Sequence, residues 1–266
     1  MQLVDRRVIV TGGARGIAEA VVRTLVKEGA KVASLDILDE EGEAVVREAN
    51  AGGPGHASYF HCDVAKREET NRVIDAAVAA LGGLDALVNI AGVERTSAAE
   101  DIADAEYDFI MDVNMRGTMY TNQAAFRHLK ATGGQIVNFG SGAGVRGMPG
   151  GAHYSASKGA VLAWSRTVAQ EWARYNITVN ADTGGDCIDG DDPGAAGRAR
   201  QGHGPGRADR RQAGRPDARP RAGHHLPRLR RRPLHHRSDA AGGRRDVIHD
   251  LTSRVSDTTE SGPADS

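Results

Sequence analysis

A serine, a tyrosine and a lysine are spaced in this sequence so that they could form an acid–base site. Tyr154 and Lys158 are four residues apart, which places both side chains on one face of a helix. A nearby ammonium favours the phenolate form of a tyrosine and lowers a pKa that is ordinarily about 10. Tyr154 could therefore act as a general acid and base, while Ser141 holds a substrate oxygen by a hydrogen bond. The Tyr-x-x-x-Lys spacing alone also fits an ordinary helix-start tyrosine beside a solvated lysine.

A glycine-rich turn follows the first apolar run of the chain. The run Val8–Val10 ends in Thr11-Gly-Gly-Ala-Arg-Gly-Ile17, and an amphipathic helical pattern begins directly after it. Glycines let a backbone approach a pyrophosphate closely, and the N–H groups at a helix start attract the same anion. The turn is therefore a candidate phosphate site. An ordinary tight turn is the alternative, because the Gly-x-x-x-Gly spacing differs from the Gly-x-Gly-x-x-Gly of many dinucleotide sites.

Two charged residues bear on which dinucleotide this turn would bind. Asp36 ends the second strand-like run, 20 residues after Gly16, where a carboxylate can accept hydrogen bonds from both hydroxyls of an adenosine ribose. The same carboxylate would repel a 2′-phosphate, although it could also be an ordinary acid at the start of a helix. Arg15 acts in the opposite sense, since a cation in the turn could attract that phosphate. NAD is favoured, and NADP is the alternative.

Strand-like and helical patterns alternate over residues 1–181. Strands are predicted at residues 8–10, 31–36, 57–61, 84–89, 135–139 and from 177 onward, and helices at residues 17–28, 40–50, 67–81, 104–132 and 154–175. Such alternation predicts an α/β fold with a doubly wound parallel sheet, a Rossmann fold, covered on both faces. Ligands of these sheets bind at the carboxyl ends of the strands, which is where the polar motifs fall.

Six motifs in chain order resemble those of the short-chain dehydrogenase/reductase family. The glycine-rich turn matches its cofactor loop, and Asp63-Val64 matches the adenine contact after the third strand. Asn89-Ile-Ala-Gly92 is similar to the family's Asn-Asn-Ala-Gly and departs from it at the second place. The other matches are Asn114 in a helix, the set Ser141, Tyr154 and Lys158, and the strand at residues 176–180.

The resemblance implies an NAD(P)-dependent oxidoreductase that interconverts a small-molecule alcohol and a ketone by hydride transfer. Tyr154 would pass the hydroxyl proton, Lys158 would hold the ribose and tune Tyr154, and Asn114 would link them to water; with Ser141 these are the expected catalytic residues. The residues expected to hold the cofactor are Thr11, Gly12, Arg15, Gly16, Ile17, Asp36, Asp63, Val64, Asn89, Ala91, Gly92, Tyr154 and Lys158. No metal site is expected, because the histidines have no ligand-spaced partners in a predicted scaffold.

Composition bounds the other functions. The net charge is −1, which argues against a chain-wide electrostatic nucleic-acid binder. The two cysteines exclude a disulfide framework. An apolar run begins by residue 8 without a preceding signal peptide, and no stretch approaches the length of a membrane span. A cytoplasmic protein is therefore expected. The family resemblance implies a homo-oligomer, paired through the helices that start near Asp104 and Tyr154.

Composition changes sharply near residue 181. Residues 182–266 contain 16 Arg but no Lys, Phe, Trp or Tyr, and so few apolar residues cannot offset the entropy of ordering the segment. The expected division is a Rossmann-type domain at residues 1–181 and a disordered tail at 182–266. The last helix and strand of the family, which form its second interface, are missing from this tail, so the oligomeric state of the chain is left open.

A shift of reading frame explains this tail. With one choice of codons for His235–Arg244, reading one base later gives Ile-Thr-Gly-Gln-Thr-Leu-Gln-Val-Asp, which is the last-strand motif of the family. The same offset turns Thr183–Asp192 into a sequence that begins Pro-Gly-Gly-Ile. We therefore expect a frameshift near codons 181–183, in the gene or in its sequencing. Two alternatives remain: an inactive remnant that still binds nucleotide, and a domain whose Arg-rich tail binds RNA or an acidic partner. The second is disfavoured because the tail lacks aromatic residues for base stacking.

Overall fold

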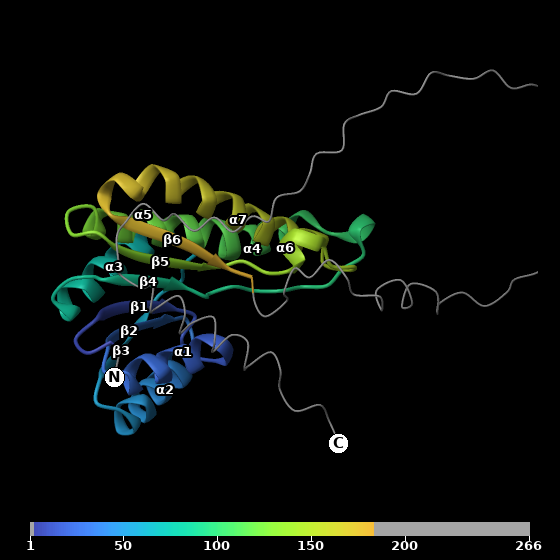
Figure 1. The fold of residues 1–266 in the computed structure, drawn as a ribbon. Coiled ribbons are helices and arrows are strands. Elements are labelled where there is room, and N and C mark those ends of the chain that lie inside the picture. Colours follow the sequence, from blue (N-terminus) through green and yellow to red (C-terminus); the bar gives the residue numbers. More distant parts are fainter. Residues whose placement is uncertain (1–2, 184–266) are drawn as a thin grey trace, which may run out of the picture. The chain divides into compact units, whose positions relative to one another are not determined.

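Six parallel strands form one sheet in the computed structural model, which describes residues 3–183 (Figure 1). The strand order is β3-β2-β1-β4-β5-β6. The strands are β1 Arg7–Thr11, β2 Lys31–Asp36, β3 His56–His61, β4 Ala86–Asn89, β5 Gly134–Phe139 and β6 Ile177–Asp182. The predicted doubly wound fold is confirmed, because this order, with every neighbouring pair parallel, is that of dinucleotide-binding sheets.

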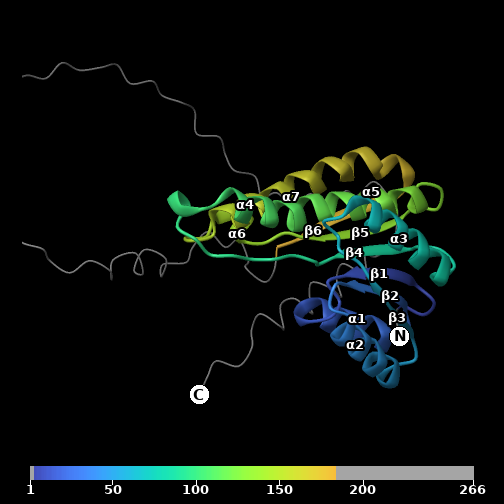
Figure 2. The same ribbon diagram turned by 180° about the vertical axis from the view of Figure 1, so that it is seen from behind.

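Helices cover both faces of the sheet. Helices α1 Gly16–Lys27 and α2 Asp39–Gly52 lie on one face, and α3 Arg67–Leu81, α5 Gly117–Leu129 and α7 Ala152–Trp172 lie on the other, as the two opposite views show (Figures 1 and 2). The short elements are η1 Ala99–Asp101, α4 Asp104–Met111, η2 Asp112–Arg116, α6 Ala143–Arg146 and η3 Ala173–Tyr175. None of the helices in residues 3–183 combines the length and apolar character needed to cross a bilayer.

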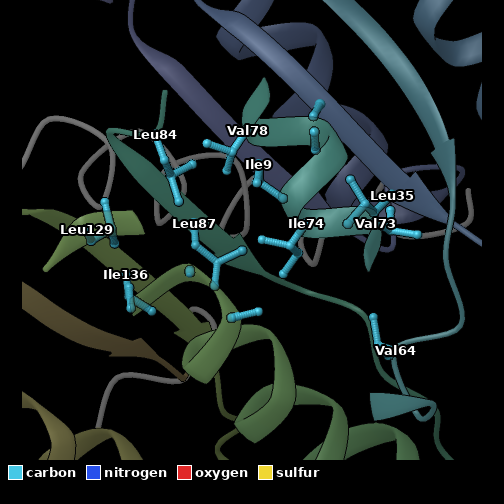
Figure 3. Packing of buried hydrophobic residues seen from close by; sticks show 14 of the residues in the cluster. Ile9, Leu35, Val64, Val73, Ile74, Val78, Leu84, Leu87, Leu129 and Ile136 are labelled. Carbon is cyan, nitrogen blue, oxygen red and sulfur yellow. The ribbon is translucent and has the colours of Figure 1, made fainter. Parts of the chain in front are cut away.

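The sheet separates two apolar cores. Val8 and Val10 point to the α1 and α2 side, whereas Ile9 between them points to the α3 and α5 side, as the two-residue period of a strand requires. The second cluster brings Ile9, Ile74 and Leu87 together (Figure 3). All three are fully buried, and each such side chain stabilises the fold by about 1.5–3 kcal/mol.

The strand order reverses between β1 and β4, so the crossovers leave these two strands in opposite directions. Thr11, the last residue of β1, is in register with Asn89, the last residue of β4. A crevice opens at this point in sheets of this type, because the helices that follow the two strands cover opposite faces. The fold therefore places the glycine-rich turn and residues 89–92 beside each other.

The sequence prediction of one long helix is wrong. The single helix expected at residues 104–132 is interrupted by the π-helical turn η2, in which the amide of Gly117 donates to the carbonyl of Asp112, five residues back. The domain boundary expected after residue 181 lies next to the end of β6, where Asp182 is buried and pairs with Phe139. The predicted disorder and shifted frame of the remaining tail lie outside the described residues.

Candidate active site

The turn after β1 and the turn after β4 are held together by one hydroxyl. The Thr11 oxygen accepts hydrogen bonds from the amides of Ile90 and Ala91, both at 3.2 Å. Gly12 follows with φ +78°, and a Cβ at this position would lie 2.9 Å from the Cα of Ala91. Only glycine accommodates both the left-handed backbone and this close approach.

The start of α1 is open for an anion. Arg15 occupies the N-cap position but contributes no side-chain capping bond, so the first amides of the helix lack the partner that a Ser or Asp cap would give. A Cβ added to Gly16 would meet no atom within 4 Å. Arg15 and Gly16 are exposed, and Ile17 is half-buried beside them. Free amides, open space and a positive helix end together fit a phosphate group.

The Asp36 carboxylate lies where β2 meets this turn. One oxygen accepts hydrogen bonds from the amides of Ile37 and Leu38 at 2.7 and 3.1 Å, and the other accepts one from the amide of Ala14 at 3.0 Å. Asp36 thus anchors the turn before α2 and also contacts the glycine-rich turn, while its contact with a ribose stays a prediction. The half-buried carboxylate retains acceptor capacity for a ribose hydroxyl.

Asp63 and Val64 follow β3 but differ in surroundings. The Asp63 carboxylate accepts a hydrogen bond from the amide of Ala65 at 3.0 Å and pairs with Lys66 at 3.2 Å. Val64 packs into the second apolar core (Figure 3). Any contribution of Val64 to a nucleotide site would therefore come from its backbone.

The side chain of Asn89 is buried, and its oxygen accepts a hydrogen bond at 3.3 Å from the hydroxyl of Thr11 at the end of β1. Its amide donates to the side-chain oxygen of Asn138 at 3.0 Å, and Asn138 exchanges hydrogen bonds with Asn122 at 2.9 and 3.1 Å. Asn138 also donates to Ser165 at 2.9 Å. This buried network joins β4 and β5 to α5 and α7. The Asn89 side chain therefore fixes the strand ends that carry the site.

Ser141, Tyr154 and Lys158 meet in one pocket. The pocket has a volume of about 230 Å³ and is lined by these three residues with Ile17, Glu94 and Thr183. The Lys158 ammonium lies 5.9 Å from the centre of the Tyr154 ring and donates to the Phe139 carbonyl at 2.8 Å. The Ser141 hydroxyl accepts a hydrogen bond from the amide of Ala143, the first residue of α6, at 3.1 Å. The structure thus brings together the residues that the sequence proposed for acid–base chemistry.

Burial tunes the charge of Lys158. Its side chain is almost fully enclosed, and desolvation lowers its pKa to about 8, against the opposing effect of the nearby Glu94 carboxylate. A Cβ added to Gly92 would lie 3.3 Å from the ammonium and 3.2 Å from Asn114. The missing side chain of Gly92 therefore leaves room beside the Lys158 ammonium for a group such as a ribose.

Asn114 is clamped between the turn after β4 and α7. Its amide donates to the Val93 carbonyl at 2.9 Å and to the Ser157 hydroxyl at 3.0 Å, and its oxygen accepts from the Val93 amide at 2.8 Å. Ser157 in turn donates to the Tyr154 carbonyl at 2.7 Å. The π-helical turn η2 carries Asn114, so the irregular helix and the site coincide.

Several residues of this site escaped the sequence analysis. Ser157 links Asn114 to Tyr154, Glu94 faces Lys158, and the Phe139 carbonyl holds the ammonium. Ser157 had a usable signal, because it precedes Lys158 on the same helix turn as Tyr154. A backbone carbonyl has no sequence signal at all. Within residues 3–183 no group of three or more His, Cys, Asp or Glu side chains is arranged to hold a metal ion.

Known proteins are similar to this chain in sequence and in fold. The family model described as short chain dehydrogenase matches residues 6–187. The chain is 40% identical over 182 residues to a 3-alpha-(or 20-beta)-hydroxysteroid dehydrogenase of Mycobacterium tuberculosis, covering 68% of each protein. It is 37% identical over 174 residues to the short-chain reductase protein NovJ of Streptomyces niveus, covering 65% of this chain and 66% of that protein.

A solved structure of NAD+-bound xylitol dehydrogenase superimposes with a TM-score of 0.67 and 31% identity, over 69% of this chain and 71% of that chain. The matched region thus spans about two thirds of the length of these relatives. The relatives named here are dehydrogenases and reductases, which are oxidoreductase enzymes. The motifs, the strand order and the extent of these matches confirm the resemblance: the chain belongs to the short chain dehydrogenase family.

Proposed function

We propose that this protein is an NAD(P)-dependent oxidoreductase that interconverts a secondary alcohol and a ketone. The observation that carries the proposal is the common pocket of Ser141, Tyr154 and Lys158 beside the open start of α1. When it is bound, a nicotinamide dinucleotide accepts or donates the hydride. The chain must then bind the substrate oxygen and move one proton.

Each of the three pocket residues has a distinct part in that proton transfer. In the oxidising direction Tyr154 takes the proton of the substrate hydroxyl, and in the reducing direction it returns the proton to the carbonyl oxygen. Lys158 stabilises the phenolate by its charge. Ser141 donates a hydrogen bond to the substrate oxygen and so orients it toward Tyr154.

The cofactor-binding residues fall into three groups, according to the part of the dinucleotide that each would contact. Thr11 and Gly12 shape the turn, and the α1 amides near Gly16 would hold the pyrophosphate. Asp36 would accept the ribose hydroxyls, which favours NAD over NADP, whereas the exposed Arg15 is the residue able to support NADP. Asp63, Ala91 and Gly92 would face the remainder of the dinucleotide, and Asn114 would connect the pocket to water.

Substitution of Tyr154 tests the chemistry. The full chain is assayed with NAD+ and with NADP+ against xylitol, cyclohexanol and a 3α-hydroxysteroid. Tyr154→Phe should lower kcat by roughly 10²-fold or more, because the proton acceptor is lost, while NADH affinity measured by fluorescence titration stays within about two-fold. Tyr107→Phe, which alters an exposed phenol of α4, is the matched control. Undiminished turnover in Tyr154→Phe would refute the assignment.

A second function has support from one observation. The match to full-length relatives stops after about two thirds of their length, and a nucleotide-binding protein without turnover is compatible with the complete strands β1 to β4 and their turns. The assay above separates the two, because this alternative predicts NADH binding without turnover of any substrate.

A further inference from the structure

We propose that Glu106 and His153 are positioning residues that hold Tyr154 in place by joining the loop after β4 to the start of α7. The inference rests on the proposed role of Tyr154. Three residues make this connection, and we call them the clip. They are Ser97 in the loop after β4, Glu106 in α4 and His153 in the first turn of α7. None of them lines the pocket that holds Tyr154.

The clip is a chain of hydrogen bonds on one carboxylate oxygen. The Ser97 hydroxyl donates to the Oε1 atom of Glu106 at 2.7 Å, and the Nε2 atom of His153 lies 2.9 Å from the same oxygen. The hydrogen bond from Ser97, followed by that from His153, holds the pKa of Glu106 below its usual value. Glu106 is therefore an acceptor, which makes Nε2 of His153 the donor and fixes its tautomer.

The clip coincides with a backbone connection between the same segments. The Ser97 amide donates to the Gly150 carbonyl at 2.8 Å, and Ser97 and Gly151 form an isolated parallel bridge. Gly151 is the N-cap of α7 and supplies no side-chain bond to it. The first turn of α7, which carries Tyr154, is consequently held from outside by Ser97 and Glu106.

The burial of His153 makes this connection rigid. Its side chain is fully enclosed, so an imidazole that loses the carboxylate would be left with an unsatisfied buried donor. At the other end of the loop, Asn114 holds Val93 by two hydrogen bonds. The segment from Val93 to Ser97, which contributes Glu94 to the pocket, is thus fastened at both ends.

The test compares Glu106→Ala with Glu106→Gln in the full chain. Alanine removes both hydrogen bonds, whereas glutamine keeps an oxygen that can accept them. Asp108→Ala, which removes an exposed carboxylate from the same helix, is the matched control. The first readout is amide hydrogen exchange of residues 92–98 and 150–155. Glu106→Ala should exchange about ten-fold faster there than Asp108→Ala and Glu106→Gln, because two bonds to a charged group are lost.

The second readout is the division between kcat and KM. With the panel substrate that turns over fastest, Glu106→Ala should lower kcat about ten-fold with NAD+ affinity unchanged, and Glu106→Gln should restore most of it. Should Glu106→Ala fail to fold, Ser97→Ala breaks the same chain at one bond and should give the same pattern more weakly. Equal amide exchange of residues 92–98 and 150–155 in Glu106→Ala and Asp108→Ala overturns the clip. An equal kcat of these two variants overturns the positioning role of Glu106. A chain without turnover refutes the proposed function, and the exchange comparison still decides the clip.

Discussion

Lys158 carries a charge at a place where the fold disfavours one. Burial lowers its pKa from 10.5 to about 8, so below pH 8 the amine is charged in both the folded and the unfolded chain and its desolvation opposes folding. As the pH rises from 8 to 10.5 the folded protein loses this proton first, and the free energy of unfolding should rise by about 1–3 kcal/mol. Urea unfolding of wild type and Lys158→Met at several pH values measures the difference. A difference independent of pH would contradict the prediction.

The carboxylate of Glu94 opposes this effect on Lys158. Glu94→Gln removes the charge that raises the pKa of Lys158, so that pKa should fall below about 8. If the ammonium supports turnover, the alkaline limb of the kcat/KM profile should then move to lower pH. Glu100→Gln, an exposed carboxylate of η1, is the control. An unmoved alkaline limb in Glu94→Gln, recorded alongside that control, would exclude the electrostatic coupling.

At the scale of elements, Asn138 joins two strands to two helices. Its amide makes four hydrogen bonds, to Asn89, to Asn122 twice and to Ser165, which is the full capacity of the group. Asn138→Ala should lower the free energy of unfolding by about 2–4 kcal/mol, because four hydrogen bonds to three buried polar partners are lost. Thr167→Ala, on the exposed face of α7, should change it by less than about 0.5 kcal/mol. Chemical denaturation monitored by tryptophan fluorescence measures both.

The elements also show how far sequence reasoning reaches. The parallel sheet could be predicted because each buried strand is a short apolar run bounded by turn residues, as at Val8–Val10. The π-helical turn at Asn114 could not, since one extra residue in a turn hardly disturbs the apolar period of the surrounding helices. The clip could not either, because His153 is 47 residues from Glu106 in the sequence and meets it only in the folded chain.

At the scale of the whole molecule, the feature that matters is β6, which among residues 3–183 is the last strand of the sheet and pairs with β5 alone. An open edge strand invites pairing with other chains. We expect that shifting the reading frame by one base across residues 182–249 supplies a further strand and so gives a monodisperse protein with tighter NADH binding. Light scattering and NADH titration of both chains measure this. If the chain as written is equally monodisperse and has protected amides across residues 190–245, the frameshift interpretation is wrong.

The order of the strands along the chain has a consequence for the protein as it is synthesised. Every residue proposed to hold the cofactor lies before residue 159, and the strands that carry the glycine-rich turn and its neighbours are the first four to be made. At about 5–20 residues per second, the remaining chain beyond residue 183 takes roughly 4–17 s to translate. During that interval a ligand that binds the folded state stabilises it by mass action. A dinucleotide held by these residues would therefore stabilise the N-terminal part of the nascent chain before the ribosome releases the protein.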